Sequence, residues 1–135
     1  MSVLWALDHA LQSASKRMEA RLDVTAPQRL VIRILGRYPD LSPGEVAAIL
    51  HLHPSTLTGI LKRLARHGLV ERRADPGDGR RARLHLTPKG RALDAVRAGT
   101  VEASVRRALA QLEARDVAVA REVARALAAE LSRLE

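Results

Sequence analysis

The sequence predicts a mainly α-helical fold with one small two-stranded β-ribbon. Hydrophobic residues make up 47% of the 135 positions but aromatic residues only 1%, so the core must be built from Leu, Val, Ile and Ala, which favours helices. Apolar residues recur at three- and four-residue steps along most of the chain, as in amphipathic helices. Residues 69–86 instead alternate in polarity around a loop rich in Gly, Pro and Asp, which predicts a hairpin.

Two helices are expected before residue 38. The first covers residues 1–22, and its apolar positions have helical spacing: Leu4, Leu7, Leu11, Ala14, Met18 and Leu22. The second covers 26–37, because Thr25 and Gln28 have the spacing of a capping box. Its inward face is predicted to carry Leu30, Val31, Ile34 and Leu35, with Arg29, Arg33 and Arg37 on the other side.

Two short helices at close spacing follow. Ser42 and Glu45 form a second capping box, which predicts a helix over 42–50. After a tight turn, a helix over 54–67 is expected to turn an apolar stripe inward: Leu57, Ile60, Leu61 and Leu64. Its other face is short and hydroxyl-bearing at the N-terminal end and cationic further on: Ser55, Thr56, Thr58, Gly59, Lys62, Arg63 and Arg66.

Such a face suits a helix that enters the major groove of DNA, where slim residues meet base edges and cations meet phosphates. An ordinary solvated face would look the same, but the hairpin that follows favours DNA. Five arginines on this hairpin need an anionic partner: Arg72, Arg73, Arg80, Arg81 and Arg83. A helix-turn-helix followed by a basic ribbon is a winged helix.

Residues 42–90 resemble the DNA-binding core of the MarR family of bacterial transcription regulators. The matching residues are Thr58, the run Leu64-(x)3-Gly68-Leu69-Val70-Glu71-Arg72, the wing Asp78-Gly79-Arg80 and the exit Leu86-Thr87-Pro88-Lys89-Gly90. The resemblance implies that Arg80 enters a minor groove while Asp78 holds its guanidinium in place, with Arg81 on the backbone. Two positions depart from the family pattern: Gly59 replaces a long contact residue, and His53 replaces Ser or Asn at the start of the helix.

The resemblance also implies an effector site between the dimerisation helices and the DNA-binding lobes. Family members usually release DNA when a small, often aromatic or anionic, molecule binds there. The expected region lies near Val96, and the candidate effector-binding residues are Trp5, His9, Arg29, Arg33 and Tyr38.

The C-terminal third is expected to be helical. Thr87 and Pro88 predict the start of a helix that runs to about Leu112, with a bend or partial break at Gly99. A joint near Glu113 leads to a last helix that reaches the C-terminus. A winged-helix region over 25–91 is too small to cover the amphipathic segments 1–24 and 92–135, so these segments are expected to form a homodimer. The MarR resemblance implies the same arrangement, with two recognition helices about 34 Å apart.

Charge and composition exclude several functions. The net charge of +8, carried mostly by arginine, indicates nucleic acid or another anionic partner. The absence of cysteine excludes disulfides, thiolate metal sites and thiol redox sensing. Apolar residues never run uninterrupted for about 18 positions, so neither a membrane span nor a signal peptide is expected, and a cytoplasmic protein is the simplest interpretation.

Enzymatic activity is not expected. The five histidines sit apart, without a nucleophile and carboxylate at triad spacing, and no phosphate-binding glycine loop or cofactor motif occurs. His51 and His53 form a short pair in the turn before the recognition helix, where two imidazoles near phosphates are favoured over a metal site. The near-absence of aromatic residues argues against single-stranded nucleic acid, because base stacking needs them.

The sequence therefore predicts a dimeric, sequence-specific regulator of double-stranded DNA, a repressor of a palindromic operator that a small molecule relieves. The expected DNA-contact residues are Ser55, Thr56, Thr58, Gly59, Lys62, Arg63, Arg66, Asp78, Arg80 and Arg81. Two alternatives stay open: a winged helix that binds other proteins, and a basic protein that binds DNA without sequence preference.

Overall fold

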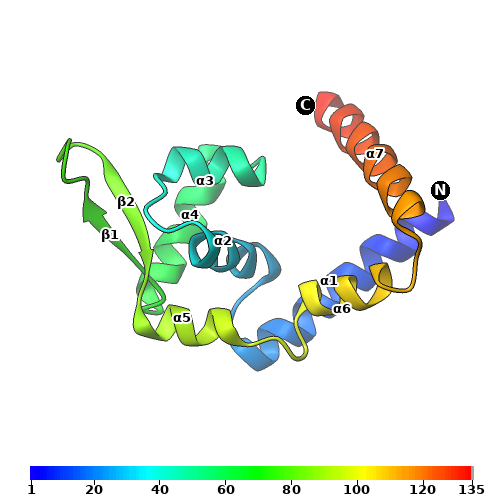
Figure 1. Cartoon of the computed structure of the whole chain (residues 1–135), viewed down its shortest axis with the longest axis horizontal. Coiled ribbons are helices and arrows are strands. Elements are labelled where there is room, and N and C mark those ends of the chain that lie inside the picture. The colour runs from blue at the N-terminus through cyan, green and yellow to red at the C-terminus, as the bar shows by residue number, and fades with distance from the viewer. Residues whose placement is uncertain (135) are drawn as a thin grey trace. The chain divides into compact units, whose positions relative to one another are not determined.

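The computed structural model describes residues 1–134 and divides the chain into two compact units, Met1–Val101 and a second that begins at Glu102. The first unit contains α1 (Ser2–Leu22), α2 (Ala26–Arg37), α3 (Pro43–Leu50), α4 (Pro54–Arg66), β1 (Val70–Ala74), β2 (Ala82–Leu86) and α5 (Pro88–Ala95). The second contains α6 (Val101–Leu109) except for its first residue, α7 (Ala114–Leu131) and a 3-10 turn (Ser132–Leu134). Figure 1 shows the order of these elements.

The helix starts in the first unit are those that the capping residues predict. Thr25 Oγ1 accepts from the Gln28 amide while Gln28 Oε1 accepts from the Thr25 amide at 2.9 Å. Ser42 and Glu45 make the same reciprocal pair at the start of α3, with distances of 2.7 and 3.2 Å. Each box satisfies backbone amides that lack a partner inside the helix, which stabilises the helix end.

The two strands form one antiparallel hairpin, the wing, in which Val70 pairs with Leu86 and Ala74 with Ala82. Leu41 joins its base, because the Leu84 amide donates to the Leu41 carbonyl at 2.9 Å. This bridge attaches β2 to the segment that leads into α3. The wing therefore begins beside the helix-turn-helix and extends away from it, as Figure 1 shows.

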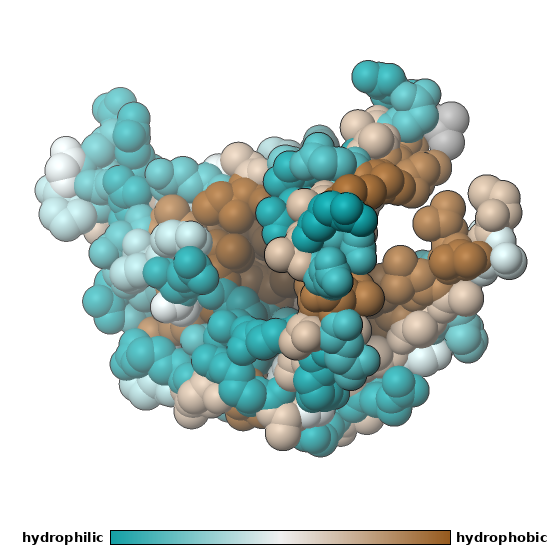
Figure 2. Space-filling model, turned by 45° about the vertical axis from the view of Figure 1, so that its right-hand side comes forward, coloured by the Kyte–Doolittle hydropathy of each residue, from teal (hydrophilic) through white to brown (hydrophobic). Residues whose placement is uncertain are grey.

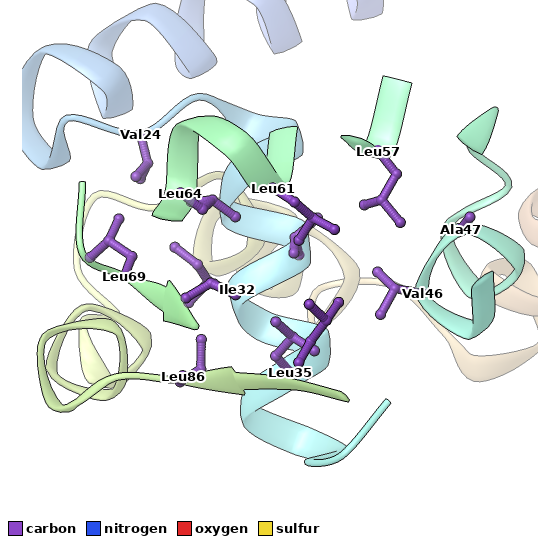
Figure 3. Packing of buried hydrophobic residues seen from close by; sticks show 13 residues of the cluster. Val24, Ile32, Leu35, Val46, Ala47, Leu57, Leu61, Leu64, Leu69 and Leu86 are labelled. Atoms are coloured by element: carbon purple, nitrogen blue, oxygen red, sulfur yellow. The ribbon is translucent and has the colours of Figure 1, made fainter. Parts of the chain in front are cut away.

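The core of this unit lies between α2, α4 and the base of the wing. In Figure 3 Ile32 and Leu35 of α2 lie among Leu61, Leu64 and Leu86. The predicted inward stripe of α4 is confirmed, because Leu57, Leu61 and Leu64 are buried and Ile60 packs against them. The prediction for α2 is wrong in part, because Leu30 is 51% exposed whereas Ile32 is fully buried. The inward stripe of α2 is Val31, Ile32 and Leu35.

Arg29 is also placed differently from the prediction, since it is only 1% exposed instead of lying on the outer side of α2. Its guanidinium donates to the carbonyl oxygens of Leu93 and Val96, at 2.6 Å each. The neighbouring Arg33 pairs with the Asp94 carboxylate at 2.6 Å. Carbonyls at a helix C-terminus lack partners within the helix and attract cations. The carbonyls at the end of α5 therefore stabilise the buried guanidinium of Arg29.

The predicted helix from Thr87 to about Leu112 is interrupted completely. Thr87 caps its start as expected, accepting from the Gly90 amide at 3.0 Å. The helix ends at Ala95, and α6 begins only at Val101. Gly99 lies between them with a φ of 66°, a left-handed conformation that an α-helix cannot contain. Arg29 holds the Val96 carbonyl and Arg21 holds that of Ala98, so side chains replace the missing helical hydrogen bonds.

Several helices carry apolar side chains that nothing in their own unit covers. In the second unit no described residue is buried, and its exposed apolar residues include Val105, Leu109, Leu112, Val123, Leu127 and Leu131. On α1 only Met18 is buried, and the exposed residues include Leu4, Trp5, Leu7 and Leu11. Figure 2 shows hydrophobic atoms at the surface of the α1 and α7 arms. Within the residues that the structure describes, no helix is long and apolar enough to cross a membrane.

Candidate nucleic-acid interface

The helix α4 presents to solvent the polar face that the sequence predicts. All seven residues expected on this face are exposed: Ser55, Thr56, Thr58, Gly59, Lys62, Arg63 and Arg66. The hydroxyl residues lie in the first turns, and Arg63 and Arg66 lie in the last turn, where cations interact favourably with the helix dipole. A Cβ atom added at Gly59 would meet nothing within 4 Å, so this position is an open notch in the face.

An imidazole caps this helix. His53 Nδ1 accepts from the Ser55 backbone amide at 3.3 Å and lies 2.7 Å from the Ser55 hydroxyl oxygen. The Thr58 hydroxyl donates to the Pro54 carbonyl at 2.9 Å. His53 therefore performs the task that Ser, Thr, Asp or Asn usually performs at a helix start, and it also fixes a side chain of the exposed face. His51 ends α3 with a left-handed φ of 51° and forms the turn between the helices.

Asp75 organises the tip of the wing, a role that the sequence analysis missed. Its Oδ1 accepts from the Gly77 amide at 2.7 Å and from the Asp78 amide at 3.3 Å, and its Oδ2 accepts from Arg83 Nε at 2.6 Å. The Gly77 amide and the Arg83 guanidinium hold the pKa of Asp75 below its usual range. The available signal was the run Asp-Pro-Gly, because an Asp side chain commonly bonds to the backbone two residues on.

Arg83 fastens the wing to the helix-turn-helix. Besides Asp75, its guanidinium donates to the Asp40 carbonyl at 3.0 Å and lies 3.4 Å from Glu45 Oε2. The Asp75 carboxylate raises the pKa of Arg83. The pKa of Glu45 is lowered by its hydrogen bond from the Ser42 amide and by the nearby Arg83. Of the five wing arginines, Arg83 therefore acts inside the protein and is not a free contact.

The contacts of Asp78 differ from those that the resemblance implies. Its Oδ1 accepts from the Arg80 backbone amide at 3.1 Å, and its Oδ2 lies 3.4 Å from Arg81 Nε. The carboxylate thus shapes the turn and pairs with Arg81, instead of holding the Arg80 guanidinium. Among the described residues, the Arg80 guanidinium has no hydrogen-bond or ion-pair partner, and its side chain is exposed at the tip. Arg80 is therefore free to meet an anion outside the protein.

The five candidate effector residues do not form one site within the first unit. Arg29 is buried on carbonyls and Arg33 is paired with Asp94, so neither offers a free guanidinium. Trp5 and His9 are exposed on α1, and Tyr38 is exposed beside Arg37. None of the five lines the cavity of about 330 Å³ between the ends of α1 and α4 and the side of α5. Its lining includes Leu22, Asp23, His67, Leu69, Leu93 and Val96.

The described part of the chain contains no group of three or more side chains of His, Asp or Glu that could hold a metal ion. Two of the histidines lie beside single carboxylates of the same unit. His67 lies 3.7 Å from Asp23, and His85 lies 3.0 Å from Asp40.

Comparison with known proteins supports the winged-helix interpretation. The MarR family model matches residues 22–81, from the end of α1 to the tip of the wing. The transcriptional repressor Rv2887 of Mycobacterium tuberculosis is 34% identical over 93 residues, which cover 69% of this chain and 67% of that protein. The chain belongs to the MarR family. The fold is accordingly a MarR-type winged helix, mostly helical with a two-stranded wing.

Two further similar proteins show how far the likeness extends. The regulator TtmR of Methylorubrum extorquens is 39% identical over 90 residues, but the match covers 67% of this chain and only 46% of TtmR. The chain thus spans about half the length of that relative. The regulator PcaV of Streptomyces coelicolor, solved with its natural ligand, is 30% identical with a TM-score of 0.71. That match covers 90% of this chain and 89% of PcaV.

Proposed function

We propose that this MarR-family protein binds double-stranded DNA sequence-specifically and acts as a dimeric repressor of a palindromic operator. The observation that carries the proposal is the pairing of two exposed features in one compact unit. The α4 face has slim hydroxyl residues followed by cations, and the adjacent wing ends in an unpaired arginine, Arg80. The first feature fits a major groove and the second fits the narrow, electronegative minor groove beside it.

The second copy of the chain would cover the exposed apolar faces of α1, α6 and α7. Large apolar side chains such as Trp5, 67% exposed, are unfavourable in water and usually mark an interaction surface. A two-fold dimer is the most frequent soluble oligomer. It presents one recognition helix from each copy to each half of a palindrome. This argument favours a second copy over a foreign protein partner.

A small-molecule effector would relieve repression by binding the DNA-incompetent arrangement more tightly. The relative PcaV was solved with a natural ligand, which supports an effector for this chain as well. The 330 Å³ cavity beside α5 is within the volume of small-ligand sites and is mainly apolar. We propose this cavity as the first candidate site, with Trp5, His9 and Tyr38 as candidates on the exposed surface.

Selection of bound duplexes from a random DNA library at near-physiological salt tests the proposal. An enriched palindrome with half-site centres about 10 bp apart is expected. Sedimentation of the protein alone should give a dimer. Binding without an enriched sequence that disappears as salt rises would instead indicate a general basic DNA binder. The absence of any binding would favour a protein-interaction module.

A further inference from the structure

Two hydroxyl groups in the first turns of α4 already donate hydrogen bonds to acceptors inside the protein. The Thr58 hydroxyl oxygen lies 2.9 Å from the Pro54 carbonyl oxygen. Since a carbonyl oxygen can only accept, the Thr58 hydroxyl must be the donor.

His53 orients the Ser55 hydroxyl as a hydrogen-bond donor in the same way. The Ser55 backbone amide can only donate, so its 3.3 Å contact makes His53 Nδ1 a hydrogen-bond acceptor. The Ser55 hydroxyl oxygen lies 2.7 Å from the same Nδ1, and it must therefore donate as well. Both hydroxyls then offer only oxygen lone pairs to anything outside the protein.

These two acceptors lie on one exposed face of the helix. Ser55 and Thr58 are three residues apart, which places them side by side on an α-helix, and both are exposed. Gly59 follows with no side chain and with open space around it. Lys62 and Arg63, the nearest long donors on α4, begin about one turn further along. Ser55 and Thr58 thus form a pair of hydrogen-bond acceptors on the exposed face near the N-terminal end of α4.

We propose that this acceptor pair makes α4 select adenine or cytosine at the two bases that Ser55 and Thr58 contact, because adenine N6 and cytosine N4 are the amino groups that donate in the major groove. This inference rests on the proposed function, because it requires α4 to lie in that groove. A free hydroxyl can face either a donor or an acceptor, and the internal bonds of Ser55 and Thr58 remove that ambiguity. Guanine O6 and N7 and thymine O4 are acceptors. Opposite a hydroxyl oxygen that offers only its lone pairs, these atoms would repel it, because no hydrogen atom lies between the two acceptors.

His53 is a positioning residue in this scheme, because it acts on the DNA through Ser55. Replacing it with Ala removes the acceptor that orients the Ser55 hydroxyl. The freed hydroxyl rotates and can then donate or accept. The base opposite Ser55 should become less restricted, whereas the base opposite Thr58 should not change.

The test uses base analogues in the operator obtained by library selection. Each adenine is replaced in turn by purine, which lacks the N6 amino group, and each cytosine by 2-pyrimidinone, which lacks the N4 amino group. Dissociation constants are measured for the wild type and for Thr58→Val, which keeps the shape but removes the hydroxyl. Because both proteins bind the same altered duplex, the comparison cancels the effect of the analogue on the duplex itself.

At one adenine or cytosine per half-site, loss of the amino group should weaken wild-type binding about tenfold and leave Thr58→Val unaffected. Thr58→Ser, which keeps the hydroxyl, should behave like the wild type. Ser55→Ala should remove the dependence on the amino group at a second base. His53→Ala should weaken the dependence at that second base and leave the base opposite Thr58 unchanged. A cap without a role in recognition would weaken every operator equally and leave the base preferences unchanged.

The alternative outcomes are separable. If the base that depends on Thr58 is a guanine or a thymine, the hydroxyl donates to DNA and the inference is wrong while the proposed function stands. The same holds if no base depends on Thr58. If the library yields no enriched sequence, the proposed function fails, and this inference fails with it.

Discussion

Asp75 and Arg83 are joined across the wing, with Asp75 Oδ2 accepting from Arg83 Nε at 2.6 Å. The same aspartate holds the turn amides of Gly77 and Asp78, and the same arginine reaches the Asp40 carbonyl and Glu45. One ion pair therefore connects the tip of the wing to the start of α3. Together with the Leu41–Leu84 bridge, this pair holds the wing against the segment that leads into α3.

Replacing Asp75 should weaken DNA binding in two steps. Asp75→Asn keeps an oxygen for the Gly77 amide but removes the charge beside Arg83, so a modest loss of operator affinity is expected. Asp75→Ala removes both contacts and should weaken binding more, with faster hydrogen exchange at the amides of Gly77 and Asp78. Equal effects of the two substitutions would show that the turn contact does not matter. The exposed Glu122→Ala in α7 serves as the control.

Acid should destabilise the fold through Asp75 and Glu45. Both folded-state pKa values are lowered, by the Gly77 amide in one case and the Ser42 amide in the other. Their contribution is therefore fully present above the unfolded values of about 3.9 and 4.3, and it is lost as pH falls through the folded values.

Urea unfolding between pH 7 and pH 3 measures this loss. The stability difference between wild type and the double variant Asp75→Asn/Glu45→Gln should be constant from pH 7 to about 5.5 and shrink at lower pH. A difference that stays the same over the whole range would contradict the assignment.

Arg80→Ala should weaken operator binding by about 1–3 kcal/mol, because its unpaired guanidinium is proposed to enter the minor groove. Arg81→Ala should cause a smaller loss, since Arg81 already pairs with Asp78 at 3.4 Å. Fluorescence anisotropy with the selected operator measures both. Wild-type affinity of Arg80→Ala would show that the wing does not insert.

Replacement of Lys62 tests the phosphate contacts of α4. Lys62→Gln should reduce the slope of log affinity against log salt by about one and leave the selected sequence unchanged. Titrations at several salt concentrations, together with a repeated library selection, provide the two readouts. A changed consensus sequence would instead place Lys62 on a base edge.

Removal of the buried guanidinium should destabilise the first unit. Arg29→Met fills much of the same volume but leaves the Leu93 and Val96 carbonyls without their partner. An unpaired buried polar group costs about 1–3 kcal/mol, so urea unfolding should show a loss of at least about 2 kcal/mol. The exposed Arg37→Met should be close to neutral. Similar stabilities for the two variants would mean that water replaces the guanidinium.

The sequence predicted those parts of the fold that depend on neighbouring residues. The caps at Thr25, Ser42 and Thr87 are local, since each side chain bonds a backbone amide three residues on. The exposed face of α4 followed from helical periodicity in the same way. The hairpin followed from its alternating pattern and its turn residues.

The parts that were not predicted depend on contacts between distant residues or on bond direction. The buried state of Arg29 requires carbonyls more than sixty positions away, which no local pattern reveals. The complete break before α6 depends on the same contact. At the candidate interface, the list of exposed residues was predictable, but the partner of Asp78 and the direction of the Thr58 hydrogen bond were not. The first depends on which guanidinium of the wing turn lies nearest to the carboxylate, and the second on the backbone carbonyl that the hydroxyl reaches.

Gly59 lies at an exposed, helical position where a Cβ would meet nothing within 4 Å. Glycine in a helix is less favourable than alanine by about 1 kcal/mol, so almost any ordinary side chain at this position should strengthen α4. Substitution of Gly59 during evolution should therefore not lower the stability of the fold. If α4 reads DNA as proposed, a duplicated copy of the gene could acquire a new sequence preference through one substitution that also stabilises its product, and the same position is the natural starting point for redesign.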